Sequence, residues 1–234
     1  MDLQNTTVCI TGGNDGLGLA MVKLLAKLCK KVIVIDRADQ QFFDEKLEYI
    51  KMDLSEEKPE IEEVDIFISN LGMSVGFKYV DSISYEDVLK MLRVNVELPL
   101  WFYKNVKWKK FVFINSVMSF VGMEGFALYS ASKGFIRLFN EGLQREKANT
   151  LIVFPYKLNT GMFSEVNDYG TLDVKDVAKD VIEGIEKDKK EIYLPFVFRY
   201  VEAMKGTMPV FVRNFVLDKV NKYYVKEELV GTEE

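Results

Sequence analysis

Short β-rich runs alternate with helical patterns along most of this chain, and the alternation restricts its fold more than any other feature. The predicted helices are Gly16–Cys29, Tyr85–Val106, Tyr129–Ala148 and Val174–Lys187. The predicted strands are Thr6–Thr11, Lys31–Asp36, Glu48–Met52, Asp65–Asn70, Lys110–Asn115, Thr150–Phe154 and Glu191–Leu194. This order predicts an α/β fold, a doubly wound parallel sheet of about seven strands with helices on both faces.

Two connections are short for a full crossover helix, those from Asp36 to Glu48 and from Asp53 to Val64. We expect trimmed helices there that cover the sheet lightly. No repeat or low-complexity linker divides the 234 residues. We therefore expect one catalytic domain over residues 1–194, with residues 195–234 as a helical tail of the same domain.

A glycine-rich turn joins the first predicted strand to the first predicted helix. Gly12, Gly16 and Gly18 permit a tight turn and close approach of the backbone to a pyrophosphate, while the helix N-terminus offers free N–H groups. The next strand ends at Asp36, whose carboxylate can bond both ribose hydroxyls of an adenosine and repel a 2′-phosphate. Taken alone, the turn also fits an ordinary strand-to-helix loop.

Tyr129 and Lys133 lie four residues apart, which places them on one face of the predicted helix. The cation can lower the pKa of the phenol, as acid–base chemistry at neutral pH requires. Ser116 follows a predicted strand and can hold a substrate oxygen. Without other motifs, the Tyr and Lys pair also fits a solvated helix face.

Together these motifs resemble the short-chain dehydrogenase/reductase family, in its compact single-domain branch, from about Thr7 to Pro195. Further segments match in the family's order. Asn70-Leu71-Gly72 resembles its Asn-Ala-Gly, with Leu71 in place of alanine, and Asn95 is similar to the asparagine whose bent helix holds a proton-relay water. The segment from Pro155 to Thr160 looks like the Pro-Gly-x-x-x-Thr beside the nicotinamide, with Tyr156 in place of glycine.

The resemblance implies a Rossmann-type fold and an NAD(P)-dependent oxidoreductase that transfers a hydride between nicotinamide and an alcohol or carbonyl substrate. The implied catalytic residues are Asn95, Ser116, Tyr129 and Lys133. Asp53 resembles the residue that touches the adenine. The expected cofactor-binding residues are Gly12, Asn14, Asp15, Gly16, Leu17, Gly18, Asp36, Arg37, Asp53, Leu54, Asn70, Leu71, Gly72, Tyr129, Lys133, Pro155 and Thr160.

The choice of cofactor depends on opposing charges. Asp36 and Asp15 favour NAD, whereas Arg37, directly after the second strand, keeps NADP as the alternative. A second function stays open, a catalytically idle dinucleotide-binding sensor or scaffold protein. The substitutions Leu71 and Tyr156 near the cofactor keep it open, but the complete catalytic tetrad argues against it.

Composition excludes several other functions. The net charge of −5 gives no reason to expect nucleic acid as a partner, and we interpret Lys104, Lys107, Lys109 and Lys110 as a solvated helix end. The chain has no histidine, which excludes Ser-His-Asp and Cys-His catalysis. Its two thiols, Cys9 and Cys29, lack the spacing of a metal site, so we expect small buried core residues in a reducing compartment. No signal-peptide pattern begins the sequence, and we expect a cytoplasmic location.

Apolar residues fall in the segments beside the inferred site and favour an apolar substrate: Met73, Val75, Phe77, Met118, Phe120, Met123 and Phe126. The resemblance implies a homodimer or homotetramer, formed through the helices predicted over Tyr85–Val106 and Tyr129–Ala148. The tail from Pro195 to Val225 predicts two amphipathic helices broken near Gly206 and Pro209. Three roles fit these helices: a cap over the pocket, a subunit interface, or a peripheral contact with a membrane.

Overall fold

The computed structural model describes residues 2–163, 167 and 169–224. Within these residues a single parallel sheet has seven strands in the order β3-β2-β1-β4-β5-β6-β7, so the predicted fold class is confirmed. Strands β2 and β3 lie on one side of β1, and β4 to β7 lie on the other. The strand order therefore reverses between β1 and β4. The strands are β1 Thr7–Thr11, β2 Lys31–Asp36, β3 Leu47–Lys51, β4 Glu63–Ser69, β5 Lys107–Ile114, β6 Thr150–Pro155 and β7 Glu191–Leu194.

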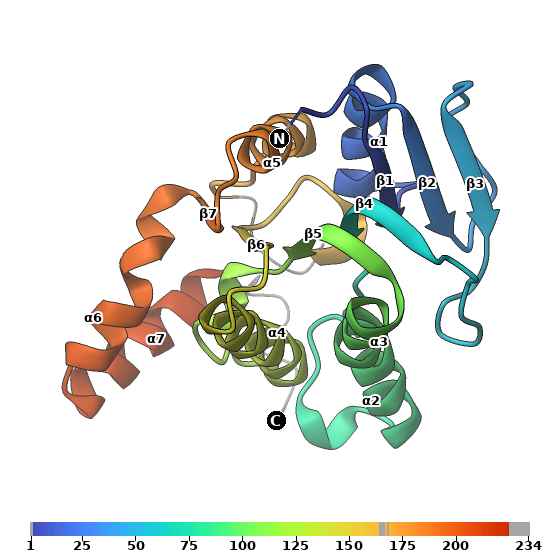
Figure 1. Cartoon of the computed structure of the whole chain (residues 1–234). Coiled ribbons are helices and arrows are strands. Elements are labelled where there is room, and N and C mark those ends of the chain that lie inside the picture. The colour runs from blue at the N-terminus through green and yellow to red at the C-terminus, as the bar shows by residue number, and fades with distance from the viewer. Residues whose placement is uncertain (1, 164–166, 168, 225–234) are drawn as a thin grey trace.

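Helices cover both faces of the sheet (Figure 1). On one face, α1 (Gly16–Leu28) packs beside α5 (Val174–Glu186), and their apolar stripes meet the buried side chains of the central strands. The other face carries α2 (Tyr85–Leu92), α3 (Leu98–Asn105) and α4 (Ala127–Arg145). Two apolar cores therefore enclose the sheet, and the strands read as nearly continuous apolar runs because both their faces are buried. Cys9 and Cys29 are buried in these cores, as predicted.

The expectation of trimmed helices in the two short connections is wrong. Residues 37–46 form an irregular segment that polar contacts hold: the Asn14 side chain donates to the carbonyl of Asp39 (2.7 Å) and accepts from the amide of Gln41 (2.9 Å). Residues 54–62 begin with a turn and continue without a helix. Pro59 lacks an amide hydrogen to donate, which disfavours a helix in the second segment.

The helix predicted over Tyr85–Val106 is interrupted by a π-helical turn over Arg93–Glu97, which separates α2 from α3. Here the amide of Leu98 donates to the carbonyl of Arg93, five residues back. Pro99 follows, and it has no amide hydrogen to bond the carbonyl of Asn95. A π-helical turn therefore interrupts the helix at Asn95, and Pro99 accounts for the missing amide hydrogen there.

The interpretation of Lys104, Lys107, Lys109 and Lys110 as one solvated helix end is wrong. Strand β5 starts at Lys107, three residues before its predicted start, and the lysine side chains then alternate between environments. Lys109 is exposed and pairs with Asp65 of β4 (Nζ to Oδ1, 2.6 Å). Lys110 is fully buried and pairs with Asp188.

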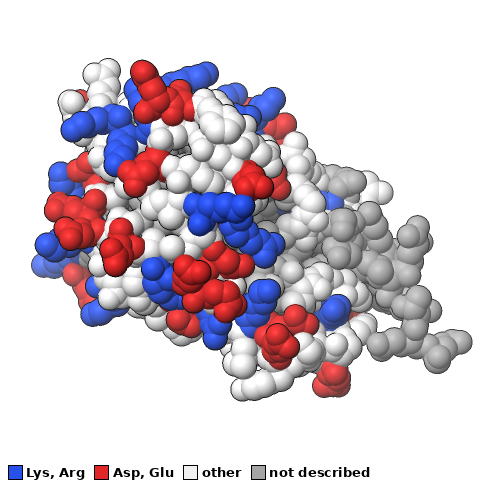
Figure 2. Space-filling model, turned by 90° about the vertical axis from the view of Figure 1, so that its right-hand side faces the viewer, with Lys and Arg blue, Asp and Glu red and all other residues white. Residues whose placement is uncertain are grey.

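The tail forms two helices, as predicted, after a 3-10 turn over Phe196–Tyr200. The expectation that both are amphipathic is wrong for the second helix, whose apolar side chains lie on more than one side, and the break falls at Pro209, because Gly206 lies inside the first helix. Helix α6 (Val201–Thr207) and helix α7 (Val210–Tyr224) meet at Met208 and Pro209, and both extend beyond the β7 side of the sheet (Figure 1). Among the helices of the described chain, none has the length and apolar character needed to cross a bilayer. On the β3 side of the molecule, basic and acidic side chains are interspersed (Figure 2).

Candidate active site

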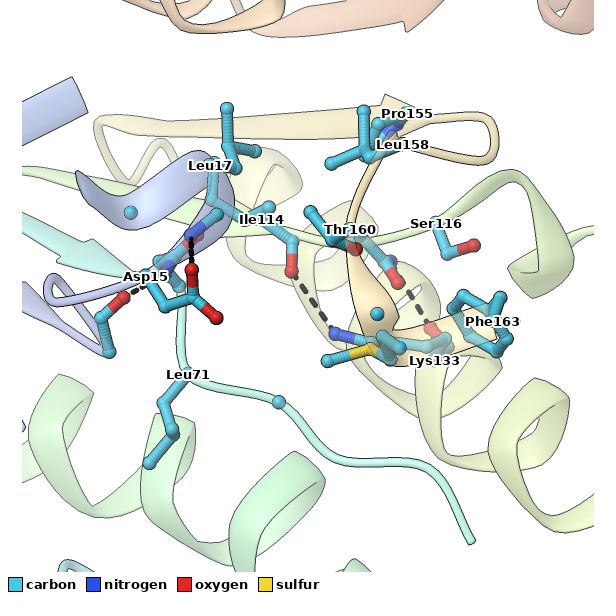
Figure 3. Close-up of a pocket in the computed structure, with 18 of the residues that line it drawn as sticks. Asp15, Leu17, Leu71, Ile114, Ser116, Lys133, Pro155, Leu158, Thr160 and Phe163 are labelled. Atoms are coloured by element: carbon cyan, nitrogen blue, oxygen red, sulfur yellow. Dashed lines mark hydrogen bonds between the residues drawn. The ribbon is translucent and has the colours of Figure 1, made fainter. Parts of the chain in front are cut away.

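A pocket of about 340 Å³ lies at the carboxyl ends of the central strands, where ligands bind in sheets of this kind. Figure 3 shows it, with Asp15 and Leu17 toward one end and Ser116 and Phe163 toward the other. The residues that line it are Gly12, Asp15, Gly16, Leu17, Gly18, Asp36, Asn70, Leu71, Gly72, Ile114, Asn115, Ser116, Tyr129, Lys133, Pro155, Tyr156, Leu158, Thr160, Gly161, Met162 and Phe163. One cavity thus joins the glycine turn to Tyr129.

The glycine turn has the backbone conformation that its sequence requires. Gly12 and Gly16 have positive φ angles of 66° and 51°. A Cβ on Gly18 would lie only 1.9 Å from the carbonyl oxygen of Gly12, so α1 can start this close to β1 only with glycine there. The side-chain amide of Asn70 donates to that same carbonyl (2.8 Å) and fixes the turn to the end of β4. Asp15 caps α1 by accepting from the amide of Gly16 (2.7 Å).

Asp36, at the end of β2, presents its carboxylate to this pocket. It accepts from the amides of Asn14 (3.1 Å) and Ala38 (3.1 Å). Arg37 faces away and lines a separate hollow with Ala38, Lys51, Met52, Asp53 and Glu57. The anionic group therefore stands inside the main pocket and the cationic group outside it.

Three predicted cofactor residues lie behind or beside this pocket. Asn14 is buried, and its side chain forms hydrogen bonds with the backbone of the segment that follows β2. Leu54 is a buried core residue. Asp53 lines the second hollow with Arg37. Hydrogen bonds from the hydroxyl and amide of Ser55 hold the pKa of Asp53 below its ordinary value.

The end of β4 forms the floor between the two halves of the pocket. The amides of Asn70 and Leu71 donate to the Thr11 hydroxyl (3.2 and 3.1 Å), which ties this strand end to β1. A Cβ on Gly72 would stand 3.4 Å from Nζ of Lys133 and 3.6 Å from Oδ1 of Asn95. The absence of a side chain at Gly72 keeps the space in front of Lys133 open.

Ser116, Tyr129 and Lys133 come together at the other half of the pocket, from the end of β5 and the first turns of α4. The Lys133 ammonium donates to the carbonyl of Ile114 (3.2 Å) and lies 5.8 Å from the centre of the Tyr129 ring. The side-chain amide of Asn115 donates to the carbonyl of Lys133 (3.1 Å) and holds α4 against β5.

Burial dominates the electrostatics of this group. It raises the pKa of Tyr129 above its ordinary value, and the hydrogen bond with Ser116 offsets only part of that rise. It also lowers the pKa of Lys133 to about 8, because the site offers the ammonium little solvation. The expectation of a lowered pKa for Tyr129 is therefore wrong for this state of the protein, because burial, which disfavours the phenolate, is the largest influence on the group.

Asn95 lies behind the pocket, on the π-helical turn. Its side chain accepts from the amide of Met73 (2.9 Å) and donates to the carbonyl of Met73 (2.9 Å) and to the hydroxyl of Ser132 (3.1 Å). It thus clamps the segment after β4 to α4. These three hydrogen bonds give its side chain a structural role, and the catalytic role that the family resemblance implies stays a prediction.

The segment after β6 closes the pocket. Pro155 and Thr160 line it, and their role in cofactor binding stays a prediction. Thr160 approaches the glycine turn, with Cγ2 3.0 Å from where a Cβ of Gly16 would be. Seven lining residues were absent from the predicted set: Ile114, Asn115, Tyr156, Leu158, Gly161, Met162 and Phe163. Strand continuity places Ile114 and Asn115 beside Ser116. The path of the loop over 156–163 depends on tertiary contacts that no local motif specifies.

An apolar cluster surrounds the Tyr129 side of the pocket. It consists of buried Met91, Met118, Met123, Phe126 and Tyr129, with Met73, Val75, Phe77 and Phe163 packed against it. The Phe163 ring meets the Tyr129 ring edge to face, with centroids 5.1 Å apart. Of the apolar residues predicted beside the site, Phe120 belongs instead to the core beneath α4.

Comparison with known proteins is consistent with this geometry. Residues 6–169 match the family model for short chain dehydrogenases. Human epidermal retinol dehydrogenase 2 is 28% identical over 172 residues, which cover 65% of this chain and 55% of that protein. The chain therefore spans little more than half the length of this relative.

Solved structures share the fold. A short chain dehydrogenase from Burkholderia cenocepacia in complex with NADP superposes with a TM-score of 0.76 at 18% identity, covering 94% of this chain and 99% of that one. A short chain dehydrogenase/reductase from Burkholderia phymatum in complex with NAD has a TM-score of 0.70 at 18% identity, covering 86% and 93%.

Proposed function

The chain belongs to the short-chain dehydrogenase/reductase family of oxidoreductases, and on this premise we propose that it transfers a hydride between a nicotinamide dinucleotide and an apolar alcohol or carbonyl substrate. The observation that carries the proposal is the continuity of one pocket, from the glycine turn and Asp36 at one end to Ser116 and Tyr129 at the other. A dinucleotide and a small substrate would meet inside it.

The residues present fit such a cofactor. The turn from Gly12 to Gly18 leaves its backbone open for a diphosphate at the start of the 13-residue helix α1. Asp36 lines the pocket and would offer carboxylate oxygens to ribose hydroxyls, and Lys133 and Thr160, which line the same pocket, would contact the nicotinamide half. When bound, the cofactor supplies or accepts the hydride.

The side chains at the Tyr129 end of the pocket would carry out the proton transfer. Ser116 and Tyr129 would hold the substrate oxygen. During reduction the phenol O–H donates its proton to the carbonyl oxygen, and during oxidation the tyrosine oxygen accepts the proton of the alcohol. Lys133, one helical turn from Tyr129, would stabilise the phenolate while it exists. In the free enzyme, the raised pKa of Tyr129 keeps the phenol protonated and ready to act as an acid.

The position of the charges favours NAD over NADP. Asp36 lines the main pocket, where its carboxylate would repel a 2′-phosphate, and Arg37 lines a separate hollow. The related solved structures hold NAD in one case and NADP in another, so kinship alone leaves the choice open.

An apolar substrate is supported by the cluster around Tyr129. Methionine and phenylalanine side chains pack around Tyr129 in a buried cluster, and Phe163, which lines the pocket, contacts the Tyr129 ring directly. The human relative is named for retinol, which is an apolar alcohol, whereas a relative from Schizosaccharomyces pombe is named for 3-hydroxy acids. The pocket that we describe is compatible with an apolar substrate.

Replacement of Tyr129 by phenylalanine tests the reaction. We expect Tyr129→Phe to lower kcat by about 10²–10⁴-fold, because the proton donor is lost, while NADH binding stays within about twofold of the wild type. Rates are followed by nicotinamide absorbance on a panel of apolar alcohols and ketones. Tyr85→Phe, at an exposed position, is the matched control.

Two results would contradict the proposal. Turnover retained by Tyr129→Phe would rule out the phenol as the proton donor. Tight NADH binding by the wild type, with no turnover on the whole panel, would favour the idle sensor or scaffold, an alternative that the oxidoreductase relatives do not support.

A further inference from the structure

The tail exposes an unusual amount of apolar surface. We call residues 196–224 the tail hairpin, which comprises the 3-10 turn, α6 and α7. Eight large apolar side chains on it are more than half exposed: Phe196, Val197, Tyr200, Met204, Val210, Phe211, Phe215 and Tyr223. Single exposed apolar residues are ordinary, but a group of aromatic ones on one projecting element marks an interaction surface.

The base of the tail hairpin is fixed to the rest of the molecule. Phe198 stacks on Tyr156 with ring centroids 5.6 Å apart. Arg137 of α4 pairs with Glu202 (2.7 Å), and the Lys205 ammonium donates to the carbonyl of Phe120 (2.9 Å). These contacts give the hairpin a defined orientation, and within the described structure they leave the side chains named above more than half exposed.

Helix α7 presents apolar side chains on more than one side. Phe211 and Phe215 are four residues apart and share one side, whereas Val216 and Val220 share the neighbouring side, turned by about 100°. All four are exposed. A helix with a single apolar stripe packs on its own core, but an exposed helix that is apolar on two sides needs an apolar surrounding.

Charge indicates what that surrounding is. The whole chain has a net charge of −5, yet residues 195–224 hold five Lys or Arg and only two Asp or Glu. Two of the cations lie against the exposed rings: Arg199 over Phe196 at 5.8 Å and Lys219 over Phe215 at 5.7 Å. Aromatic anchors accompanied by basic residues suit an anionic lipid surface. A symmetric pairing of two such hairpins would bring like charges together.

We propose that the tail hairpin docks on an anionic lipid surface, lying in the plane of the headgroups with its aromatic side chains in the acyl boundary. Docking would also bring Asn167 and Tyr169 close to the bilayer, because α7 contacts both: Tyr169 stacks on Tyr223 (4.9 Å), and Asn167 donates to the Tyr223 carbonyl (2.6 Å). The docking itself is independent of the proposed reaction, since it is measured without substrate or cofactor.

Sedimentation with sucrose-loaded vesicles tests the proposal on the full chain. We expect the protein to sediment with vesicles of phosphatidylcholine and phosphatidylserine, and to bind phosphatidylcholine alone much more weakly. Each of Arg213→Gln and Lys219→Gln should weaken binding about fivefold. Phe211→Ser and Phe215→Ser should weaken it more than tenfold together. High salt should weaken the wild type.

Matched controls are available elsewhere on the surface. Phe43→Ser changes an equally exposed aromatic residue after β2, and Lys175→Gln changes an exposed lysine on α5, and neither should alter binding. Circular dichroism and a thermal melt of each variant show that it is folded. A wild-type protein that stays in the supernatant with anionic vesicles overturns the proposal. So does a Phe211→Ser variant that changes from dimer to monomer while its vesicle binding is unchanged, because the hairpin would then be a contact between copies.

Discussion

Burial of the Lys133 ammonium lowers its pKa from an ordinary value of 10.5 to about 8. Below pH 8 the lysine is charged in both the folded and the unfolded chain. Between pH 8 and 10.5 the unfolded chain binds a proton that the folded chain has released, so the free energy of unfolding rises with pH across this window, by about 3 kcal/mol. Tyr129 acts above this range, because its raised pKa makes stability fall at pH values above 10.

The variant Lys133→Met should remove the first of these effects. Methionine fills a similar volume without a charge, so the variant should lack this pH dependence. The free energy of unfolding of the wild type minus that of the variant should therefore increase by about 3 kcal/mol from pH 8 to pH 10.5. Urea denaturation at steps from pH 7 to 10.5 measures both proteins. A difference between them that does not change with pH would show that Lys133 is not a desolvated ammonium in the folded chain.

Asp36 allows a second prediction for a single residue. In Asp36→Ser the carboxylate that faces the main pocket is lost, so we expect NADPH to bind at least about tenfold more tightly than it binds the wild type, and NADH to bind more weakly. Calorimetry with both cofactors measures the change, and Asp44→Ser, in the loop after β2, is the control. A wild type that already prefers NADPH would refute the assignment of NAD.

The sequence allowed most of the site to be predicted residue by residue, because Gly12, Asp36, Asn70 and Ser116 all follow strands of one parallel sheet. The ends of such strands meet at one edge, so order along the chain is enough to place these side chains together. The pKa of Tyr129 was predicted in the wrong direction, since spacing along a helix reports the nearby cation but not the depth of burial. Phe163 was missed because a loop determines its position.

At the scale of elements, the junction of β1 and α1 yields a sharp prediction. Gly18→Ala would place a Cβ 1.9 Å from the Gly12 carbonyl and 2.7 Å from the Asn70 amide, so the turn must open. We expect the variant to lose measurable NADH binding and to unfold at a lower temperature. Calorimetry and a thermal melt provide the two readings.

Gly142→Ala is the matched control for that change. Gly142 lies inside α4, and a Cβ there would meet nothing within 4 Å. The alanine should therefore stabilise the protein by about 0.5–1 kcal/mol, by favouring the helix, and leave NADH binding unchanged. Equal effects of the two substitutions would contradict a specific role for the glycine turn.

Helices and strands with a clear hydrophobic periodicity were predictable from the sequence. Segments whose conformation depends on contacts with residues far away in the sequence were not. The seven strands and four main helices follow from runs and periodicities in the sequence. The segment after β2 is irregular because the Asn14 side chain, from the glycine turn, binds its backbone. The start of β5 at Lys107 depends on pairing with β4, where Glu63 is the partner of Lys107.

At the scale of the whole molecule, the described tail is attached to the main fold at the α4 side, through Phe198, Glu202 and Lys205. These contacts support the proposal that residues 195–234 belong to the same domain as residues 1–194, although residues 225–234 lie outside the described structure. A cytoplasmic location stays a prediction. The sequence indicated both tail helices, but only their placement shows that several of their aromatic side chains are exposed within the part of the chain that the structure describes.

A second unpartnered surface supports the expected homo-oligomer. Helices α2 and α4 lie side by side on one face of the sheet (Figure 1), and both expose apolar residues, among them Leu89 of α2 and Phe135 and Leu138 of α4. We propose that a second copy covers this surface, and we expect Leu138→Glu to convert a dimer or tetramer to smaller species, because the carboxylate would be buried without a partner. Sedimentation equilibrium measures the mass, and Phe43→Glu, at an exposed site remote from these helices, should leave it unchanged. A wild type that sediments as a monomer at every concentration, or an oligomer that Leu138→Glu leaves intact, would show that this surface is not where the copies meet.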